Sequence, residues 1–464
     1  MSSLTALIMA AGAGTRMRSS LPKVAHPVCG KPMIAWSVDA ALGAGADRVC
    51  AIVSPDRDLS SYLPEGVETV VQPEADGTGG ALKAAEGVIA ESELVLVLSG
   101  DQPLVSPEEI GLLRSEAEKS GAAAVVLTAD LPDPGAYGRV IRGEDGSVER
   151  IVEAKAPGDA TEEELSVTEV NAGTYLFSAD SLVEALVKIT NDNAQGEYYL
   201  PDVLPAIREA GGVIEACVTE AVAVGVNDLV ELAAVEAEAR RVLLADHMRN
   251  GVTVVDPDST LVDADVEIAP DVRIEPGCSI QGASRIESGA LIGPRTTVID
   301  SRVGEASEVV SSHLDSCTIG AGVKVGPFAH IRPGTELADG SKAGSFVEIK
   351  NSRIGQGAKV PHLSYVGDAD VGEESNLGAS TITANYDGKE KHRTKIGRNV
   401  RTGVDTTLVA PVEVGDEAYT GAGSVITEDV PAGSLGIERS EQHNVEGYAD
   451  RQQKRSGDEK GGEK

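Results

Sequence analysis

The chain is poor in the residues that mark membrane-spanning, secreted and nucleic-acid-binding proteins. It has 464 residues with five Cys, one Trp, nine Tyr and three Phe, and no apolar run approaches the roughly 18 residues of a membrane-spanning helix. The cysteines have no C-x-x-C spacing, which favours reduced thiols in a cytoplasmic protein. Asp and Glu number 74 against 40 Lys and Arg, a formal net charge of −34. This acidity argues against nucleic acid or an anionic membrane as the main partner.

Glycine is abundant, and the first glycine-rich segment directly follows a predicted strand. Residues 4–8 are apolar, and residues 9–17 have the sequence MAAGAGTRM. Where side chains are small, a ligand can approach the backbone closely, and successive N–H groups at a strand-to-helix turn bind anions. Arg16 and Lys23 add two positive charges. The segment therefore predicts a nucleoside triphosphate site at the Gly12 turn, although no Gly-Lys-Ser/Thr of a Walker loop follows.

Residues 1–227 alternate short apolar strands with amphipathic helices. Helical patterns such as 32–42 and 79–89 separate strands that are predicted at 4–9, 48–53, 68–71, 94–98 and 123–128. This alternation is typical of a doubly wound, Rossmann-like α/β sheet. Ligands of such sheets bind beyond the carboxyl ends of the strands, which is where the Gly12 turn falls.

The second half of the chain has a different period. Residues 228–250 lack Pro and Gly and predict one long linker helix. From residue 251, one aliphatic residue recurs at every sixth position: Val262, Ile268, Ile274, Ile280, Ile286, Ile292 and Val298. This spacing predicts a parallel β-helix over residues 251–448, with three short strands in each coil. Interruptions at 303–317 and 383–395 predict protruding loops, and the charged tail at 449–464 is predicted to be disordered.

Three more segments of the first half carry polar groups at strand ends. They are QPEADGTG at 72–79, SGD at 99–101 and VGVN at 224–227. Gly77 and Thr78 can hydrogen-bond a nucleobase or a phosphate. Asp101 follows the most apolar strand, where a carboxylate can hold Mg²⁺ on phosphate oxygens, although an aspartate that caps a turn is the alternative. Asn227 can complete the metal site through its carbonyl oxygen.

With these segments, the sequence resembles the sugar-1-phosphate nucleotidylyltransferases. Further matching segments are YGR at 137–139, IVE at 151–153, NAG at 171–173 and NAQGEYYL at 193–200. With the hexapeptide half included, the chain to about residue 448 resembles the bifunctional N-acetylglucosamine-1-phosphate uridylyltransferase / glucosamine-1-phosphate N-acetyltransferase family. The resemblance implies a left-handed β-helix and a homotrimer with sites between chains.

For the first half, the resemblance implies Mg²⁺-dependent attack of N-acetylglucosamine-1-phosphate on the α-phosphorus of UTP, with release of pyrophosphate. It assigns Asp101 and Asn227 to the metal. It assigns UTP and UDP-N-acetylglucosamine binding to Met9, Ala10, Ala11, Gly12, Arg16, Lys23, Gln72, Gly77, Thr78, Ser99, Gly100, Asp101, Gly138, Glu153, Asn171 and Asn227. The nucleophile is already ionised, so positioning and charge neutralisation carry the rate. Ala13 stands where a lysine is common in the family.

For the second half, the resemblance implies transfer of an acetyl group from acetyl-CoA to the amine of glucosamine-1-phosphate. It makes His362 the general base that accepts the amine proton. It assigns the sugar phosphate to Arg332, Lys350, Tyr365 and Asn376. It assigns acetyl-CoA to Ala379, Asn385, Tyr386, Val404, Ala422 and Arg439, with Val404 where a serine is common. It also has Lys391, in the loop at 383–395, reaching a neighbouring subunit.

Three other hypotheses stay open at this point. The chain could be a monofunctional nucleotidylyltransferase whose β-helix only forms a trimer, or a nucleotide-sugar sensor without activity. A zinc site of the carbonic-anhydrase type would need His313, His330 and His362, which are 17 and 32 residues apart. Neither step is a multiple of six, so the spacing does not predict that these histidines stack. The bifunctional reading predicts a supply of UDP-N-acetylglucosamine for peptidoglycan and other cell-envelope polysaccharides, including a lipopolysaccharide precursor.

Overall fold

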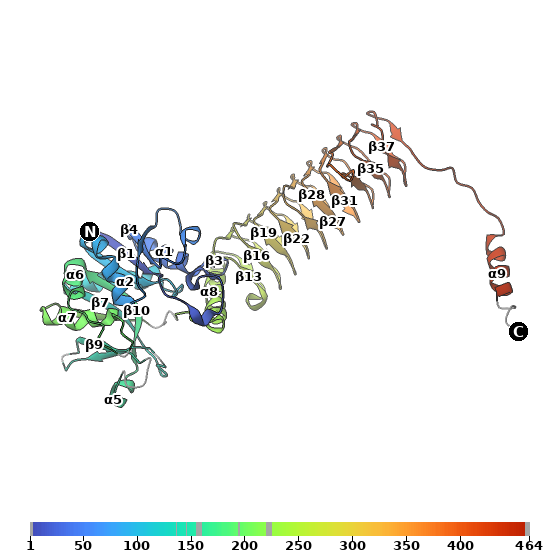
Figure 1. Cartoon of the computed structure of the whole chain (residues 1–464). Coiled ribbons are helices and arrows are strands. Elements are labelled where there is room, and N and C mark those ends of the chain that lie inside the picture. The colour runs from blue at the N-terminus through green and yellow to red at the C-terminus, as the bar shows by residue number, and fades with distance from the viewer. Residues whose placement is uncertain are drawn as a thin grey trace. The chain divides into compact units, whose positions relative to one another are not determined.

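The computed structural model describes residues 3–135, 137–144, 146–154, 160–193, 195–219 and 225–459, the last six of these by their backbone alone. The chain forms two compact units. Unit 1 comprises Met1–Asp246 and Val262–Asp265, and unit 2 comprises His247–Leu261 and Val266–Lys464. Figure 1 shows unit 1 as helices around a sheet and unit 2 as a ladder of short strands.

A mixed sheet forms the centre of unit 1. Its strand order is β11-β7-β10-β6-β1-β4-β5, with β8 and β9 attached beside β10. The strands are β1 (Leu4–Met9), β4 (Arg48–Val53), β5 (Glu68–Val71), β6 (Leu94–Ser99), β7 (Ala124–Asp130), β8 (Arg139–Arg142), β9 (Val148–Val152), β10 (Glu169–Ser178) and β11 (Ile214–Thr219). The five predicted strands are confirmed to within two residues at each end. The sequence did not reveal β10, which runs antiparallel to β6 and β7.

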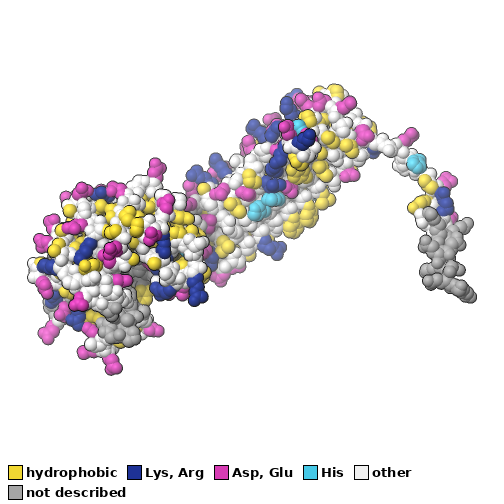
Figure 2. Space-filling model, in the orientation of Figure 1, with side chains coloured by type: hydrophobic (Ala, Val, Ile, Leu, Met, Phe, Trp, Pro, Cys, Tyr) yellow, Lys and Arg dark blue, Asp and Glu magenta, His cyan; other side chains and the backbone are white. Residues whose placement is uncertain are grey.

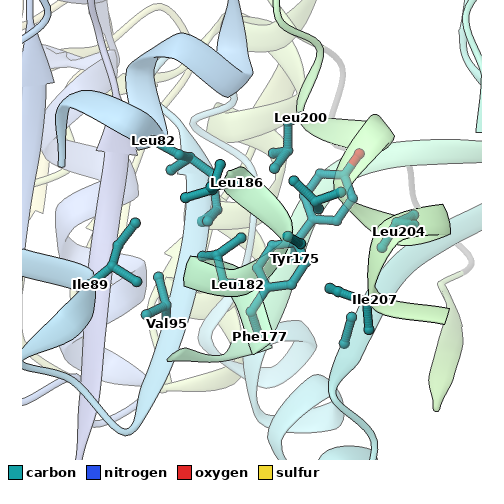
Figure 3. Close-up of a cluster of buried hydrophobic side chains, with 14 of the residues drawn as sticks. Leu82, Ile89, Val95, Tyr175, Phe177, Leu182, Leu186, Leu200, Leu204 and Ile207 are labelled. Atoms are coloured by element: carbon teal, nitrogen blue, oxygen red, sulfur yellow. The ribbon is translucent and has the colours of Figure 1, made fainter. Parts of the chain in front are cut away.

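Helices cover both faces of this sheet, as the doubly wound prediction requires. They are α1 (Met33–Gly43), α2 (Thr78–Ala84), α3 (Glu86–Ala90), α4 (Pro107–Ser120), α5 (Glu162–Leu165), α6 (Ala179–Leu186) and α7 (Val203–Glu209). Leu7 belongs to the core on the α2, α3, α6 and α7 face, whereas Ala6 and Ile8 belong to the core with α1 and α4, because alternate residues of a strand point to opposite faces. Figure 3 shows Tyr175 and Phe177 of β10 within the first of these cores. The predicted helix at 79–89 is divided at Ala85.

The predicted linker helix is α8 (Leu229–Arg249). The Asp228 side chain caps it, since Oδ1 accepts hydrogen bonds from the backbone N–H groups of Val230 and Glu231, both at 2.9 Å. Val235 and Ala239 pack into a small core with residues that include Val28 and Met33. No helix in the described part of the chain combines the length and the apolar character needed to cross a bilayer.

Unit 2 is a left-handed β-helix made of three parallel sheets. The first contains β12 (Thr253–Val254), β15 (Arg273–Ile274), β18 (Leu291–Ile292), β21 (Glu308–Val309), β24 (Lys324–Val325), β27 (Lys342–Ser345) and β30 (Lys359–His362). The second contains β13 (Leu261–Val262), β16 (Ser279–Gln281), β19 (Thr297–Ile299), β22 (His313–Asp315), β25 (His330–Ile331), β28 (Glu348–Lys350), β31 (Tyr365–Gly367), β33 (Ile382–Ala384), β35 (Thr407–Val409) and β38 (Val425–Ile426). The third contains β14 (Glu267–Ile268), β17 (Arg285–Ile286), β20 (Arg302–Val303), β23 (Thr318–Ile319), β26 (Glu336–Leu337), β29 (Arg353–Ile354), β32 (Ala369–Val371), β34 (Thr394–Ile396) and β36 (Val412–Val414).

The aliphatic residues of the six-residue period fill the interior of this β-helix. Ile274, Ile280 and Ile292 have no exposed surface. The predicted loop at 303–317 does not exist: Val303, Val309 and Leu314 continue the buried row at steps of five, six and five residues. The coil from Val298 to Leu314 therefore has 16 residues instead of 18, which breaks the sequence register although the chain stays in the β-helix.

The loop predicted at 383–395 is confirmed between β33 and β34, where Tyr386 and Lys391 form an isolated antiparallel bridge. The tail, predicted to be disordered from residue 449, instead begins with α9 (Tyr448–Glu459). Its Arg, Gln and Lys residues are good helix formers, and residues 448–453 are exposed.

Candidate functional sites

A cavity of about 360 Å³ lies where β1 and β6 end in unit 1. Its walls include much of the predicted nucleotide-binding set, namely Met9, Ala10, Ala11, Gly12, Lys23, Gln72, Gly77, Thr78, Ser99 and Asp101. Gly14, which the sequence analysis did not assign, also lines it. A Cβ at Gly14 would lie 2.6 Å from the Cβ of Lys23, and its φ of +61° is in the left-handed region, so only glycine lets Lys23 lie against the turn.

Residues 197–200, the end of the segment NAQGEYYL, hold one wall of this cavity. The backbone N–H of Leu200 donates to the Thr78 hydroxyl at 2.9 Å. A Cβ at Gly77 would lie 2.5 Å from the carbonyl oxygen of Tyr198, so these two segments touch through their backbones. Gln72 Nε2 donates to the carbonyl oxygen of Gly77 at 3.1 Å. The Thr78 hydroxyl thus accepts one hydrogen bond, and its hydrogen and second lone pair can serve a ligand.

Four of the predicted phosphate and metal residues meet at the edge of the cavity. The Lys23 ammonium forms an ion pair with Asp101 and donates to Asn227 Oδ1 at 3.0 Å. Arg16 Nη2 donates to the same Asn227 oxygen at 2.8 Å. Ser99 Oγ donates to Asp101 Oδ1 at 2.7 Å. Three distant segments of the chain therefore place two cations and two oxygen ligands together.

This donor set fits Mg²⁺. The Lys23 ammonium occupies the point between the Asp101 carboxylate and the Asn227 carbonyl oxygen, which shows that both oxygens can contact one cation. Mg²⁺ prefers oxygen ligands and usually takes one or two from the protein, with phosphates and waters completing its shell. The backbone N–H of Asn227 donates a hydrogen bond to Glu231 Oε2 at 2.6 Å, which fixes the position of this residue. Among the described residues, no group of three or more His, Cys, Asp or Glu is placed to hold a metal.

The predicted sugar residues form a second cluster outside the walls of that cavity. The backbone N–H of Asn171 donates to the carbonyl oxygen of Gly138 at 2.9 Å, and Asn171 Nδ2 donates to the Tyr175 hydroxyl at 2.6 Å. Burial, reinforced by the negative charge of Glu153, raises the pKa of Tyr175. The same two causes raise the pKa of Asp202. Glu153 is thus near both Tyr175 and Asp202. Neither of these two residues was predicted from the sequence.

In unit 2, the predicted phosphate-binding residues follow successive coils. Arg332 directly follows β25, Lys350 ends β28 and Tyr365 begins β31 in one sheet. Arg332 Nη1 donates to Glu348 Oε1 at 2.7 Å. The neighbouring Lys391 ammonium lowers the pKa of Lys350, so the loop at 383–395 returns to the coil of Lys350 within its own chain. Figure 2 shows Lys and Arg side chains gathered on this unit beside a band of hydrophobic side chains.

His362 lies apart from that set. It ends β30, which belongs to a different sheet from Tyr365, and its side chain is exposed. Asn376 is on the same side, because it bridges to Lys359 of β30. Within the described residues, the His362 ring makes no hydrogen bond or ion pair, so one chain does not bring it against Arg332.

The spacing argument about the other histidines was wrong. His313 and His330 are neighbours on β22 and β25, and their rings stack edge to face with centroids 5.1 Å apart. They meet because this coil has 17 residues instead of 18. Burial, reinforced by His313, lowers the pKa of His330. His362 lies in another sheet, so the three histidines do not converge.

Four of the predicted acetyl-CoA residues stack on neighbouring coils. The N–H of Asp405, next to Val404, donates to the Ala379 carbonyl oxygen at 2.7 Å. The N–H of Gly423, next to Ala422, donates to the Val404 carbonyl oxygen at 2.9 Å. Arg439 Nη1 donates to the Ala422 carbonyl oxygen at 3.0 Å. The structure therefore brings Ala379, Val404, Ala422 and Arg439 into one row.

Comparisons with known proteins decide the family. Residues 6–198 match the MobA-like NTP transferase domain. The chain is 45% identical to the bifunctional protein GlmU of Shouchella clausii, over 97% of this chain and 99% of that protein. It is 44% identical to GlmU of Mycolicibacterium gilvum over 97% and 92% of the two chains, and 46% identical to GlmU of Caldanaerobacter subterraneus over 97% and 98%. The chain belongs to the GlmU family.

Membership of the GlmU family covers both units. The similarity extends over nearly the whole chain, whereas a nucleotidylyltransferase with an unrelated hexapeptide tail would match over residues 1–227 alone. The bifunctional reading is therefore favoured over the monofunctional one.

Arg57, which sequence reasoning missed, contacts the Gly12 turn. It lies after β4, and its Nη1 donates to the Gly12 carbonyl oxygen at 2.9 Å. Lys23 and Arg16 both contact Asn227, whereas Arg57 reaches the turn itself. Across the described residues, Arg57 forms no ion pair with a carboxylate. No motif surrounds it in the sequence, since only the fold brings it within reach of a turn 45 residues earlier.

Proposed function

We propose that this GlmU-family chain makes UDP-N-acetylglucosamine in two steps. Unit 2 transfers an acetyl group from acetyl-CoA to glucosamine-1-phosphate, and unit 1 transfers a uridylyl group from UTP to the N-acetylated product. The observation that carries this proposal is the similarity to bifunctional GlmU proteins over both units, joined to the cluster of Lys23, Asp101 and Asn227 in unit 1. We expect the product to feed peptidoglycan and other cell-envelope polysaccharides.

In unit 1, the chain's own groups bind and orient two anions. The glycine turn offers backbone N–H groups to the triphosphate, and Arg16 and Lys23 oppose its charge. Asp101 and Asn227 hold Mg²⁺, which contributes further neutralisation of phosphate charge when bound. Gly138, Glu153 and Asn171 bind the sugar. The sugar phosphate is already ionised, so the site needs no general base and works by in-line positioning.

In unit 2, the amine of glucosamine-1-phosphate attacks the thioester of acetyl-CoA. Arg332, Lys350, Tyr365 and Asn376 bind the sugar phosphate. His362 Nε2 or Nδ1 accepts the amine proton as the C–N bond forms, and the thiol of coenzyme A leaves. Acetyl-CoA lies along the row that contains Ala379, Val404, Ala422 and Arg439, with Asn385 and Tyr386 at its loop end.

The homotrimer is part of this proposal. Lys391 lies near Lys350 of its own chain, but the His362 ring has no partner within its own described chain, so we expect a neighbouring copy to complete the site. An apolar ladder supports contact between copies: Phe328, Phe346 and Leu363 are 56%, 58% and 60% exposed. The rings of Phe328 and Phe346 stack with centroids 5.2 Å apart. Such large exposed apolar groups on neighbouring coils are typical of a protein–protein interface.

A cytoplasmic location completes the proposal. UTP and acetyl-CoA are supplied in the cytoplasm, and all five cysteines are free thiols. Burial raises the pKa of Cys50 and of Cys317 to about 11, which keeps both thiols unreactive.

The test is an assay of the purified chain with UTP, acetyl-CoA, Mg²⁺ and glucosamine-1-phosphate, in which free thiol and pyrophosphate are followed together. We expect both products. Pyrophosphate from added N-acetylglucosamine-1-phosphate without any thiol release from glucosamine-1-phosphate would support the monofunctional alternative. Tight nucleotide-sugar binding without either product would support a sensor.

A further inference from the structure

A row of polar side chains follows one corner of the β-helix beside the proposed acetyl-transfer site. Asn351, Asp368 and Asn385 each directly follow a strand of the same sheet, β28, β31 and β33, and they are separated by steps of 17 residues. Asn351 Nδ2 donates to Asp368 Oδ1 at 2.5 Å. Asn385 Nδ2 donates to Asp368 Oδ2. One carboxylate is thus held between two amides on consecutive coils.

Asp368 has no evident role in binding substrate directly. It is 8% exposed, and Asn385 is 7% exposed. Burial opposes ionisation, but hydrogen bonds from Asn351 and Asn385, with the charges of Lys350 and Lys391, lower the pKa of Asp368. The side chain is therefore an ionised carboxylate, and an ionised carboxylate can only accept hydrogen bonds.

This chemistry fixes which way the Asn385 amide points. Because Asp368 can only accept, the NH₂ group of Asn385 must face it, and the Asn385 carbonyl oxygen Oδ1 must face the other way. In the described part of the chain, Oδ1 of Asn385 accepts no hydrogen bond. A Cβ on Gly367 would lie 2.4 Å from the Tyr365 hydroxyl and 2.9 Å from Asn385 Nδ2. The amide therefore lies beside Tyr365, at the proposed sugar-phosphate site.

The same coil also anchors the loop that Asn385 begins. Arg393, at the far end of the loop, forms a bidentate ion pair with Asp370, with Nε to Oδ2 at 2.6 Å. The N–H of Thr394 donates to the Asp368 carbonyl oxygen at 3.1 Å. Both ends of the loop are thus held by Asp368 and Asp370, so the amide at residue 385 starts from a fixed backbone.

We propose that Asp368 is a positioning residue for acetyl transfer: it holds the Asn385 amide so that Oδ1 is presented to an N–H donor of the bound substrates. That donor is the amine of glucosamine-1-phosphate or an amide N–H of the acetyl-CoA arm. This inference rests on the proposed function of unit 2 and assigns no proton transfer to Asp368.

The test is a double-mutant cycle with Asp368→Asn and Asn385→Ala in the full-length chain. An asparagine at position 368 can donate as well as accept, so it no longer dictates the orientation of its neighbour. We expect Asp368→Asn to lower kcat/KM for acetyl transfer about tenfold, the effect of one lost oriented hydrogen bond. In the Asn385→Ala background, Asp368→Asn should have less than a further twofold effect. A rise confined to KM for acetyl-CoA identifies the coenzyme arm as the donor, whereas a fall in kcat with the sugar saturating identifies the amine.

Two controls separate positioning from folding. Asp416→Asn removes an aspartate that also accepts two hydrogen bonds, both from Arg398, on another coil, and should leave acetyl transfer unchanged. Uridylyl transfer and Tm are measured on every variant. If Asp368→Asn does not fold, Asp368→Ser takes its place. Acetyl transfer within twofold of wild type in Asp368→Asn overturns the inference, as do multiplicative effects in the double variant. Absence of acetyl transfer in the wild-type chain overturns the proposed function itself.

Discussion

Replacement of Asp101 by alanine tests the uridylyl site most sharply. The Asp101 side chain is 20% exposed and contacts the Lys23 ammonium, whose side chain is 13% exposed. The substitution removes one of two proposed Mg²⁺ ligands and the carboxylate partner of a largely buried ammonium. Mg²⁺ and the Lys23 ammonium would share one position beside Asp101, so one charge-assisted contact is lost, at about 3 kcal/mol, which is about a hundredfold in kcat/KM. The assay is pyrophosphate release from UTP and N-acetylglucosamine-1-phosphate across a Mg²⁺ titration.

The control for that experiment is Asp39→Ala. Asp39 also forms an ion pair with a lysine, Lys31, but it does not line the nucleotide cavity. We expect Asp39→Ala to keep nearly full uridylyl transfer, and both variants to keep acetyl transfer. Uridylyl transfer by Asp101→Ala with an unchanged rate and an unchanged Mg²⁺ dependence would refute the metal assignment.

Three further predictions concern other residues. His362→Ala should abolish acetyl transfer, measured as thiol release, and leave uridylyl transfer nearly intact; loss of both activities in a folded protein would contradict the two-site account. Arg57→Ala should raise KM for UTP about fivefold, the effect of one exposed charge contact. Adding Ala13→Lys to that variant should return KM toward the wild-type value, because it places a cation at the turn again. An unchanged KM in Arg57→Ala would leave Arg57 with no role in UTP binding. Phe346→Asp should shift the particle measured by light scattering from trimer to monomer and reduce acetyl transfer, whereas an unchanged trimer would place the interface elsewhere.

Local patterns in the sequence predicted most of the fold. One aliphatic side chain per six residues is enough to indicate a β-helix, because each interior position needs one. The same rule misjudged 303–317, since coils can lose single residues at their corners while Val303, Val309 and Leu314 stay buried. It also missed the contact between His313 and His330 for the same reason. The antiparallel strand β10, which pairs with β6 and β7, escaped prediction because Asn171 and Gly173, residue types that are rare in strands, interrupt its pattern at an irregularity of the pairing.

The nucleotide site was predictable from the sequence where a glycine or a carboxylate closely follows the end of a predicted strand. Gly12 and Asp101 follow that rule, and they line one cavity with Lys23, which comes from the same motif as Gly12. Arg57 and Asp368 do not, because their roles depend on contacts across 45 and 17 residues that no local motif encodes. His362 shows the other limit: its role comes from the resemblance, and the described chain gives its ring no partner.

The central claim is that one chain carries two sites that act in order. It is tested most directly by pyrophosphate release with glucosamine-1-phosphate as the only sugar, measured with and without acetyl-CoA. The account predicts pyrophosphate only when acetyl-CoA is present, after a lag in which thiol appears first. Pyrophosphate released at the same rate without acetyl-CoA would contradict it.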